Sequence, residues 1–390
     1  MKICACVAEY NPFHLGHLKH IDYMKSVLGA EKIIVLMSGN FTQRGEPAVT
    51  DKFTRAKHAI LAGADLVIEL PTVFATANEE TFATGAVNII NALGCVDGLC
   101  FGVESGEKKA YITLADAMLD ESKEFKRALK EKLADGISLA KAKFEALKAL
   151  GKTEYDHKLI SSPNNILGLE YTKAILKNQS YIDIYPMLRD GDHNDTTLKK
   201  GVTSATSIRE VLKTGKIKKL KKNLPPFVYT DLKEYPFAFD KLIMASAITS
   251  STDTFAKIAD CTEGLENRIK AFTKDNHSVD ALVDKVSTKR YTTTRVKHIL
   301  TANLLGIDKA LTEDSLKNKL YAKILAVNSQ SKDLISLLSE KSAIPVLTRK
   351  SDAAALKKTA AKCFEKDCLA NDLYSLATGE KKNEHQMLII

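Results

Sequence analysis

The sequence lacks several features that would assign the chain to a particular class of protein. It has no internal repeat, and no apolar stretch approaches the length of a membrane span. The N-terminal residues, one lysine followed by an apolar run that ends at Glu9, do not have the pattern of a signal peptide. We therefore expect a cytoplasmic protein with no membrane partner. The absence of tryptophan excludes nothing.

Cysteine is present but follows neither a disulfide pattern nor a metal-binding pattern. The seven cysteines are an odd number at irregular spacing, and Cys363 and Cys368 form no recognised metal motif. Cys4 and Cys6 lie within an apolar run. We therefore expect reduced cysteines in the core and no protein-held metal.

The bulk composition is that of an ordinary globular chain. Hydrophobic residues make up 45% and charged residues 27% of the 390 residues, a length that suggests two or three domains. The net charge of +9 permits a nucleic-acid partner without proving one.

Strand and helix signals alternate over the first two hundred residues. Short apolar runs typical of buried strands occur at 2–8, 32–37, 66–70, 98–102 and 182–188. Helical patterns fill the intervals at 17–28, 52–62 and 79–93. This alternation predicts an α/β fold, a Rossmann-like parallel sheet with helices on both faces. Ligands of such sheets bind beyond the carboxyl ends of the strands.

The second half of the chain reads as mostly helical. Lys213–Lys222 holds six lysines in ten residues and leads to Leu224-Pro225-Pro226. We place a domain boundary there, with a catalytic domain over 1–222 and a mostly helical domain over 223–390, in which helices are expected at 310–327 and 352–376. A helical, Ala- and Lys-rich insertion is expected at about 107–152, where a solvated helical face is the simplest interpretation.

The most informative residues are Asn-Pro-Phe-His-Leu-Gly-His at 11–17, directly after the apolar run Ile3–Ala8. A strand, a loop and a helix N-terminus in succession form an anion site, because free backbone N–H groups point at the loop. Gly16 lets a phosphate approach the backbone, and His14 and His17 can donate hydrogen bonds to it and stabilise charge at the α-phosphorus. A surface pair, a helix cap or half of a metal site are the alternatives.

His14–His17 resembles the HxGH signature of the nucleotidylyltransferase superfamily. The longer string Val7–His17 is similar to one family in particular, the bacterial tRNA(Met) cytidine acetate ligases. Further stretches that fit this family are 37–47, 64–71, 100–102, 162–168, 204–209 and 289–292. The match covers most of the chain to about residue 310.

The resemblance implies an activity and its substrates. ATP, with Mg²⁺ carried on it, activates acetate as acetyl-adenylate, and the acetyl group passes to N4 of the wobble cytidine of elongator tRNA(Met). The first domain is then a nucleotidylyltransferase-like, ATP-binding domain, and the helical domain contacts tRNA.

The resemblance also implies site residues. His14 and His17 are the expected catalytic residues. The ATP-binding residues expected in the first loop are Val7, Ala8, Glu9, Tyr10, Asn11, Pro12, Phe13, His14, Leu15, Gly16, His17, Leu18, Lys19 and His20. Those expected elsewhere are Gly102, Asn165, Arg189, Ser204, Thr206, Ser207 and Arg209.

Each of these distant residues also has a simpler interpretation. Gly102 leaves room for adenine or ribose, or is a plain turn, and Asn165 reads adenine or ribose, or caps a helix. Arg189 binds phosphate or carboxylate, or forms a surface ion pair. Ser204–Arg209 holds the leaving pyrophosphate at a helix start, or is only a helix cap. The loop after Arg189 departs from the family pattern, which puts a role for His193 in doubt.

Two basic segments are candidates for tRNA contact. One segment interleaves cations with an aromatic ring, a mixture suited to phosphate contact and base stacking. Its candidate residues are Lys289, Arg290, Tyr291 and Arg295. Lys213–Lys222 is the other candidate, with a solvated lysine face as the alternative.

Two other functions share parts of this pattern. A small-molecule adenylyltransferase of coenzyme biosynthesis would use the same loop chemistry but would not need a basic, helical second half. A non-catalytic RNA-binding protein would not need the HxGH loop. A class I aminoacyl-tRNA synthetase is disfavoured, because no Lys-Met-Ser-Lys-Ser-like loop is present.

Overall fold

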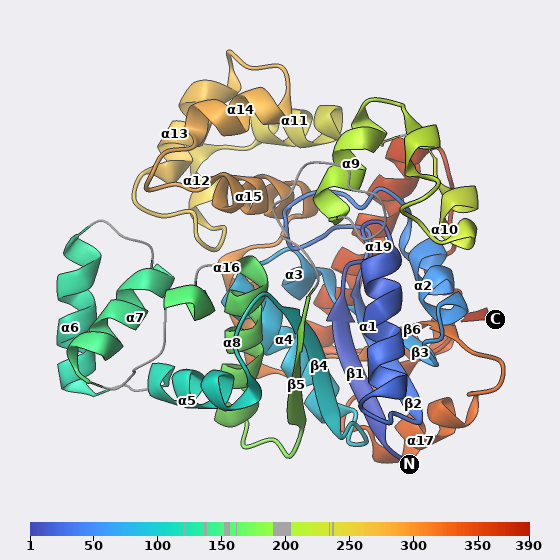
Figure 1. Ribbon diagram of the computed structural model, residues 1–390. Coiled ribbons are helices and arrows are strands. Elements are labelled where there is room, and N and C mark those ends of the chain that lie inside the picture. The colour runs from blue at the N-terminus through green and yellow to red at the C-terminus, as the bar shows by residue number, and fades with distance from the viewer. Residues whose placement is uncertain are drawn as a thin grey trace.

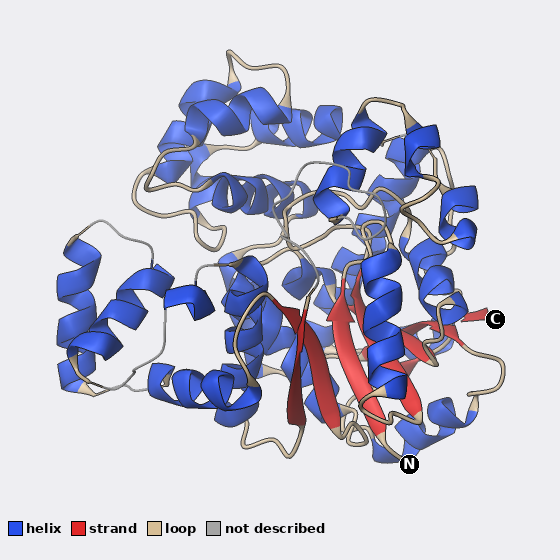
Figure 2. Ribbon diagram, viewed as in Figure 1, coloured by secondary structure: helices blue, strands red, loops and turns tan. Residues whose placement is uncertain are grey.

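The computed structural model describes residues 1–119, 122–135, 139–151, 157–160, 162–189, 204–233, 235 and 238–390. Strands gather in one sheet, and helices surround it and form a separate layer above it (Figures 1 and 2). None of the described helices is long and apolar enough to cross a membrane.

The centre of the sheet is five parallel strands in the order β5-β4-β1-β2-β3. They are β1 (Ile3–Ala8), β2 (Lys32–Ser38), β3 (Leu66–Leu70), β4 (Gly98–Val103) and β5 (Asp183–Leu188). All five strands predicted from the apolar runs are confirmed, with ends that differ by at most one residue.

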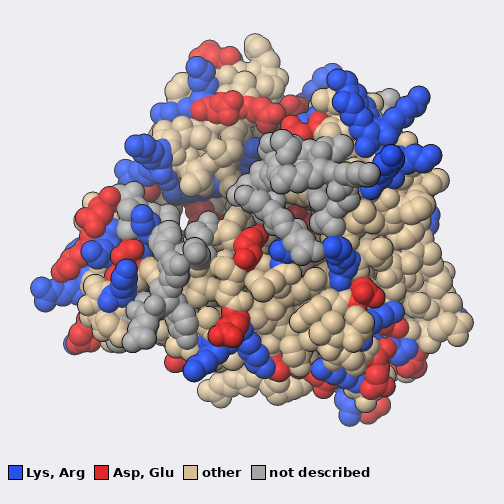
Figure 3. Space-filling view, in the orientation of Figure 1, with Lys and Arg blue, Asp and Glu red and all other residues tan. Residues whose placement is uncertain are grey.

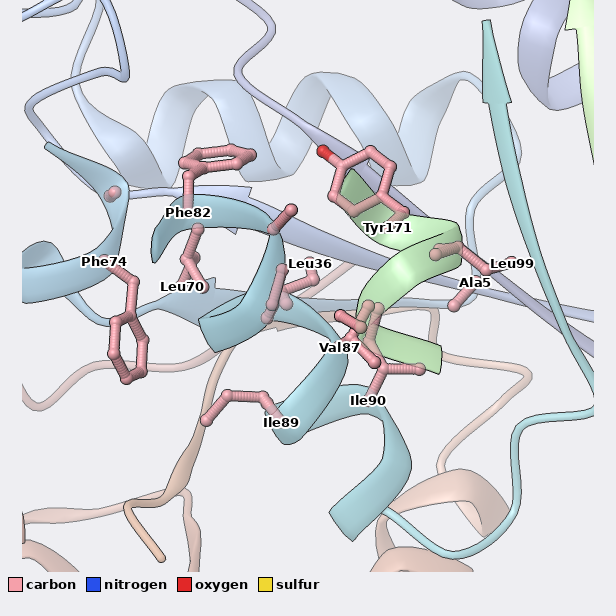
Figure 4. Close-up of a cluster of buried hydrophobic side chains, with 14 of the residues drawn as sticks. Ala5, Leu36, Leu70, Phe74, Phe82, Val87, Ile89, Ile90, Leu99 and Tyr171 are labelled. Carbon is pink, nitrogen blue, oxygen red and sulfur yellow. The ribbon is translucent and has the colours of Figure 1, made fainter. Parts of the chain in front are cut away.

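Both faces of the sheet are buried, as continuous apolar strands require. Along β1, Ile3 and Ala5 belong to one apolar cluster, and Cys4 and Cys6 to the other. Helices α4 (Glu79–Ala92) and α8 (Pro163–Lys177) cover the first face, where Figure 4 shows Tyr171 and the α4 side chains near Leu36 and Leu99. Helices α1 (Leu15–Ser26) and α2 (Lys52–Leu61) cover the second.

Three further strands extend the sheet beyond β3. They are β6 (Ala322–Val327), antiparallel to β3, and β7 (Val346–Leu347) and β8 (Leu388–Ile389), each parallel to β6. The helix expected over 310–327 is therefore wrong beyond Lys317, where α16 ends. All six residues of β6 are buried. Pairing with β3 decides the conformation of this apolar run, whose local pattern is ambiguous.

The division at residue 222 consequently does not separate the sheet from the helices. Residues 239–305 form a helical body with its own apolar core, whereas the chain beyond it returns to the sheet. The helices of this body are α11 (Phe239–Thr249), α12 (Thr252–Ala256), α13 (Leu265–Thr273), α14 (Val279–Val286) and α15 (Thr293–Leu305). Figure 1 shows them above the carboxyl ends of the parallel strands.

The remaining helices flank the sheet and the helical body. The insertion consists of α5 (Lys108–Met118), α6 (Lys123–Ala134) and α7 (Leu139–Ala149). It is more than a solvated face, because α5 packs on α8 and buries Tyr111 and Leu114 in the core. The others are α3 (Thr72–Ala75), α9 (Ala205–Lys213), α10 (Pro226–Asp231), α16 (Lys309–Lys317), α17 (Asp333–Lys341), α18 (Lys350–Ala354) and α19 (Lys358–Thr378), with short 3₁₀ turns η1 (His157–Ile160) and η2 (Ile217–Leu220).

Candidate functional site

The strand order creates a switch point between β1 and β4. From β1 the chain adds β2 and β3 on one side, and then β4 and β5 on the other. The loops after β1 and β4 leave the sheet in opposite directions there, which opens a crevice where α/β sheets bind ligands. Residues 11–17 and Gly102 both belong to this edge.

The two histidines of the loop after β1 are held by the start of α1. His14 is the N-cap, and its Nδ1 accepts a hydrogen bond from Gly16 N at 3.0 Å. The Nδ1 of His17 accepts from His14 N at 3.2 Å, and the two rings stack with centroids 3.7 Å apart. Because Nδ1 is an acceptor in both, each neutral ring carries its hydrogen on Nε2. The fold thus sets two N–H donors side by side at a helix N-terminus.

Buried aromatic rings support this pair from behind. Tyr10 and Phe13 are almost fully buried, with ring centroids 4.8 and 5.5 Å from that of His17. The His17 ring is therefore packed on two sides and keeps one orientation.

Arg55 of α2, which was not predicted as a site residue, ties the loops after β1 and β2 together. Its Nε donates to Thr50 O at 2.8 Å, and its Nη1 donates to Glu9 O at 2.7 Å and Ser38 O at 3.0 Å. Its Nη2 donates to Gly39 O. The side chain is fully buried, so a rigid guanidinium fork holds four backbone carbonyls. The only signal in the sequence is a cation on the inward face of an amphipathic helix.

Gly102 and Arg189 meet at the end of β4 and β5. A Cβ atom on Gly102 would lie 2.9 Å from Cδ of Arg189, so the arginine stem occupies the space beside the glycine. In this conformation, the space beside Gly102 is therefore filled by the side chain of Arg189. Burial lowers the pKa of the Arg189 guanidinium, and the charge of Glu104 partly opposes this shift.

Asn165 holds the loop after β4 and is not a helix cap. Its Oδ1 accepts from Glu104 N at 2.9 Å and from the Tyr111 hydroxyl at 3.0 Å, and its Nδ2 donates to Ser105 Oγ at 2.9 Å. The cap of α8 is Ser162. Asn165 thus shapes the β4 side of the crevice.

Glu104, which was also missed, accepts hydrogen bonds from the side chains of Ser162 and Asn164. Its position directly after a buried strand is the signal in the sequence that could have identified it.

His20 lies under the crevice, one turn further along α1. Its Nε2 is 3.2 Å from Cys100 Sγ. Burial, with a smaller contribution from the charge of Arg189, lowers the pKa of His20 to about 4. The imidazole is therefore neutral at physiological pH.

The Ser204–Arg209 segment reaches the loop after β1. Ser204 caps α9 by accepting from Ser207 N at 3.1 Å, so its role as a helix cap is confirmed. Arg209 donates from Nη1 to Asn11 O at 2.8 Å and from Nη2 to Thr206 Oγ1 at 3.2 Å. The structure thus brings this segment and the histidine loop together. The stretch before it, including His193, lies outside the described residues.

The cluster at 289–295 belongs to the helical body. Tyr291 is buried and donates to Glu263 O at 2.6 Å. The guanidinium carbons of Arg290 and Arg295 lie 5.9 and 5.5 Å from the centroid of its ring. The hydroxyl and the ring of Tyr291 thus both have partners within the helical body. Both arginines also contact the Glu263 carboxylate, while Lys289 and Arg290 remain exposed.

The lysine-rich segment after α9 forms an exposed basic surface. Leu220 and Leu224 anchor it in the apolar cluster that covers α1 and α2. Figure 3 shows Lys and Arg gathered where Figure 1 places α9 and α10. The exposed lysines are Lys216, Lys218, Lys219, Lys221 and Lys222. Within the described ranges, no group of three or more His, Cys, Asp or Glu is arranged to hold a metal ion.

Comparison with known proteins identifies first a class and then a family. Residues 1–387 match the family model described as HIGH Nucleotidyl Transferase. The tRNA(Met) cytidine acetate ligase of Clostridium perfringens is 36% identical over 401 aligned residues, which cover 100% of this chain and 98% of that protein. The protein of that name from Acetivibrio thermocellus is 37% identical over 392 residues, which cover 96% and 94%. The chain belongs to the tRNA(Met) cytidine acetate ligase family.

Two solved structures have the same fold as this chain. The apo form of Thermotoga maritima TmcAL superposes with a TM-score of 0.94 at 29% identity, and the form bound with alpha-thio ATP with 0.91 at 28%. Both alignments cover 100% of each chain.

Proposed function

We propose that this protein is an ATP-dependent ligase that activates acetate as acetyl-adenylate and transfers the acetyl group to N4 of the wobble cytidine of elongator tRNA(Met) in the cytoplasm. The observation that carries the first step is the pair of Nε2–H donors on His14 and His17 at the N-terminus of α1. The relatives that bear this name over nearly their whole length support the second step.

In the first step, an acetate oxygen attacks the α-phosphorus of ATP and pyrophosphate leaves. We assign the phosphates to the loop after β1, residues Val7–His20, where His14 and His17 donate to oxygens whose negative charge grows during displacement. Mg²⁺ enters with the triphosphate. The nucleoside is assigned to the β4 side of the crevice, with Gly102, Asn165 and Arg189 around it.

The start of α9 is assigned to the leaving pyrophosphate. Ser204, Thr206 and Ser207 supply hydroxyl groups at a helix N-terminus, and Arg209 supplies a cation. The bond from Arg209 to Asn11 O supports this assignment, because it joins this segment to the histidine loop.

In the second step, the exocyclic amine of cytidine attacks the acetyl carbonyl carbon, AMP leaves, and the amine loses a proton. The RNA backbone is assigned to the exposed Lys289 and Arg290 and to the lysines of the segment after α9. Their exposure and the position of the helical body above the crevice support this assignment (Figures 1 and 3).

The test is a reconstitution with purified protein, ATP, Mg²⁺, acetate and an elongator tRNA(Met) transcript, followed by mass spectrometry of the nucleosides. N4-acetylcytidine is expected only when acetate is present, and acetyl-CoA is expected not to replace acetate and ATP. Absence of the product at every salt concentration, or its formation from acetyl-CoA alone, would contradict the proposal.

A further inference from the structure

Helix α15 of the helical body contacts the loop that follows β2, residues 39–47. Thr301 donates from Oγ1 to Gly45 O at 2.8 Å, and His298 Nε2 bonds to Gln43 O. Lys297 forms an ion pair with Glu46. Three side chains of one helix face thus hold three successive parts of one loop.

The approach is also close at the level of the backbone. Gly45 has a φ of +67°, and a Cβ atom there would lie 2.6 Å from the carbonyl carbon of Lys297 and 2.7 Å from His298 N. The loop and the helix therefore touch without any side chain between them, so a shift of α15 would move the loop.

The same loop touches the segment that leads into the histidine loop. Gln43 N donates to Glu9 Oε1 at 2.7 Å, on the residue directly after β1. Arg55 then links Glu9 O to Ser38 O and Gly39 O. The contacts run from α15 through Gln43 to Glu9, the residue next to Tyr10, whose ring packs against His17.

His298 is the donor of the hydrogen bond in this contact. It is almost fully buried, and burial lowers its pKa, opposed by its bond to Gln43 O. A neutral ring facing a carbonyl must carry its hydrogen on Nε2, so His298 is the donor. This bond and that of Thr301 both restrain carbonyl groups of the loop.

We propose that His298 and Thr301 are positioning residues for adenylation, so that the helical body shapes the ATP site as well as any RNA surface. The proposal rests on the proposed function. It gives two roles to this region of the chain: the inward face of α15 acts on the first step, and the exposed residues before α15 act on the RNA step.

The experiment measures acetate-dependent ATP–pyrophosphate exchange without RNA. In Thr301→Val and His298→Ala we expect kcat of exchange to fall about tenfold or more, because small displacements of positioned groups slow chemistry strongly. His298→Gln, which keeps an amide donor, should recover part of the rate. Thr294→Val, the same change at an exposed position of α15, is the matched control and should behave as the unmodified protein.

Exchange at the unmodified rate in both variants, with a loss only in RNA acetylation, would overturn the proposal. If Thr301→Val lowers the thermal midpoint, Glu46→Gln probes the contact from the loop side and should also reduce kcat, and an unchanged kcat there counts against the proposal. The proposed function fails separately, when the unmodified protein shows no acetate-dependent exchange.

Discussion

Each histidine of the loop after β1 uses its two ring nitrogens differently. The Nδ1 atoms accept backbone hydrogen bonds that close the first turn of α1, and the neutral rings therefore present Nε2–H. A substitution can place a polar atom near one ring nitrogen and not near the other. Such substitutions separate the contribution of the histidine to the start of the helix from its contribution to the reaction.

His17→Asn keeps an acceptor near the position of Nδ1 and removes the Nε2 donor. We expect the helix to remain and acetate-dependent pyrophosphate exchange to fall by roughly 10²-fold or more, the scale for a lost donor to developing charge. His17→Gln places an amide near Nε2 and should retain more activity. Equal activity of His17→Asn and the unmodified protein would remove His17 from the phosphate site.

His20 gives the free energy of unfolding a dependence on pH. Its folded pKa of about 4 lies below the ordinary value of 6.5, so between these values only the unfolded chain binds the proton. This contribution destabilises the protein as the pH falls below about 6.5. Between pH 7 and 5 we expect His20→Gln to lose about 2 kcal/mol less than the unmodified protein in urea unfolding. Parallel losses in the two proteins would contradict a lowered pKa of His20.

At the scale of elements, the crevice is built by helices that lie outside it. Arg55 on α2 holds the loops after β1 and β2, and α15 holds the loop after β2 from above. The parallel strands bring the loops to one edge, but these helices decide how closely the loops approach one another.

Gly45→Ala tests this close approach. The substitution combines an unfavourable positive φ with a Cβ atom 2.6 Å from the backbone of α15. We expect a loss of about 2 kcal/mol or more in the free energy of unfolding, together with slower pyrophosphate exchange. Gly29→Ala is the control, because Gly29 has a φ of +66° with nothing within 4 Å, and should cost only about 1 kcal/mol. Equal costs at the two positions would exclude the steric contact.

At the scale of the whole molecule, a buried ionic network ties the last residues of the chain to the sheet. Lys52 Nζ lies 2.7 Å from both Glu69 Oε1 and Glu384 Oε1, and Lys323 Nζ lies 2.9 Å from Glu69 Oε2. All four side chains are at most 8% exposed. Glu384, far along the chain, therefore joins Glu69 of β3 in balancing the buried positive charges of Lys52 on α2 and Lys323 on β6.

Removing Glu384 takes away one of the two carboxylates that form ion pairs with the buried Lys52 and Lys323. We expect Glu384→Ala to lower the free energy of unfolding by about 3–5 kcal/mol, seen as a lower denaturant midpoint at unchanged slope. The nearby Glu380→Ala breaks a more exposed pair with Lys233 and should cost at most about 1 kcal/mol. A Glu384 cost as small as that of Glu380 would show that the network is not needed.

The predictions that succeeded rest on local pattern, and those that failed depend on distant contacts. The strands, the helix starts and the cap at Ser204 follow from apolar runs and capping residues within a few positions. The strand at 322–327, where a helix was expected, depends on a partner far away in the sequence, β3. The hydrophobic pattern within a segment does not indicate which distant segment will pair with it.

The sequence by itself determined the five parallel strands, the HxGH loop after the first of them, and its position at a helix N-terminus. These follow from hydrophobic period and turn chemistry, which are local properties of the chain. Only the tertiary structure decided which ring nitrogens of His14 and His17 remain donors, that Arg189 lies over Gly102, and that α15 holds the loop after β2. Each of these depends on atoms that packing brings together across the sheet edge. The distance between two residues along the sequence does not indicate how close they lie in the folded structure.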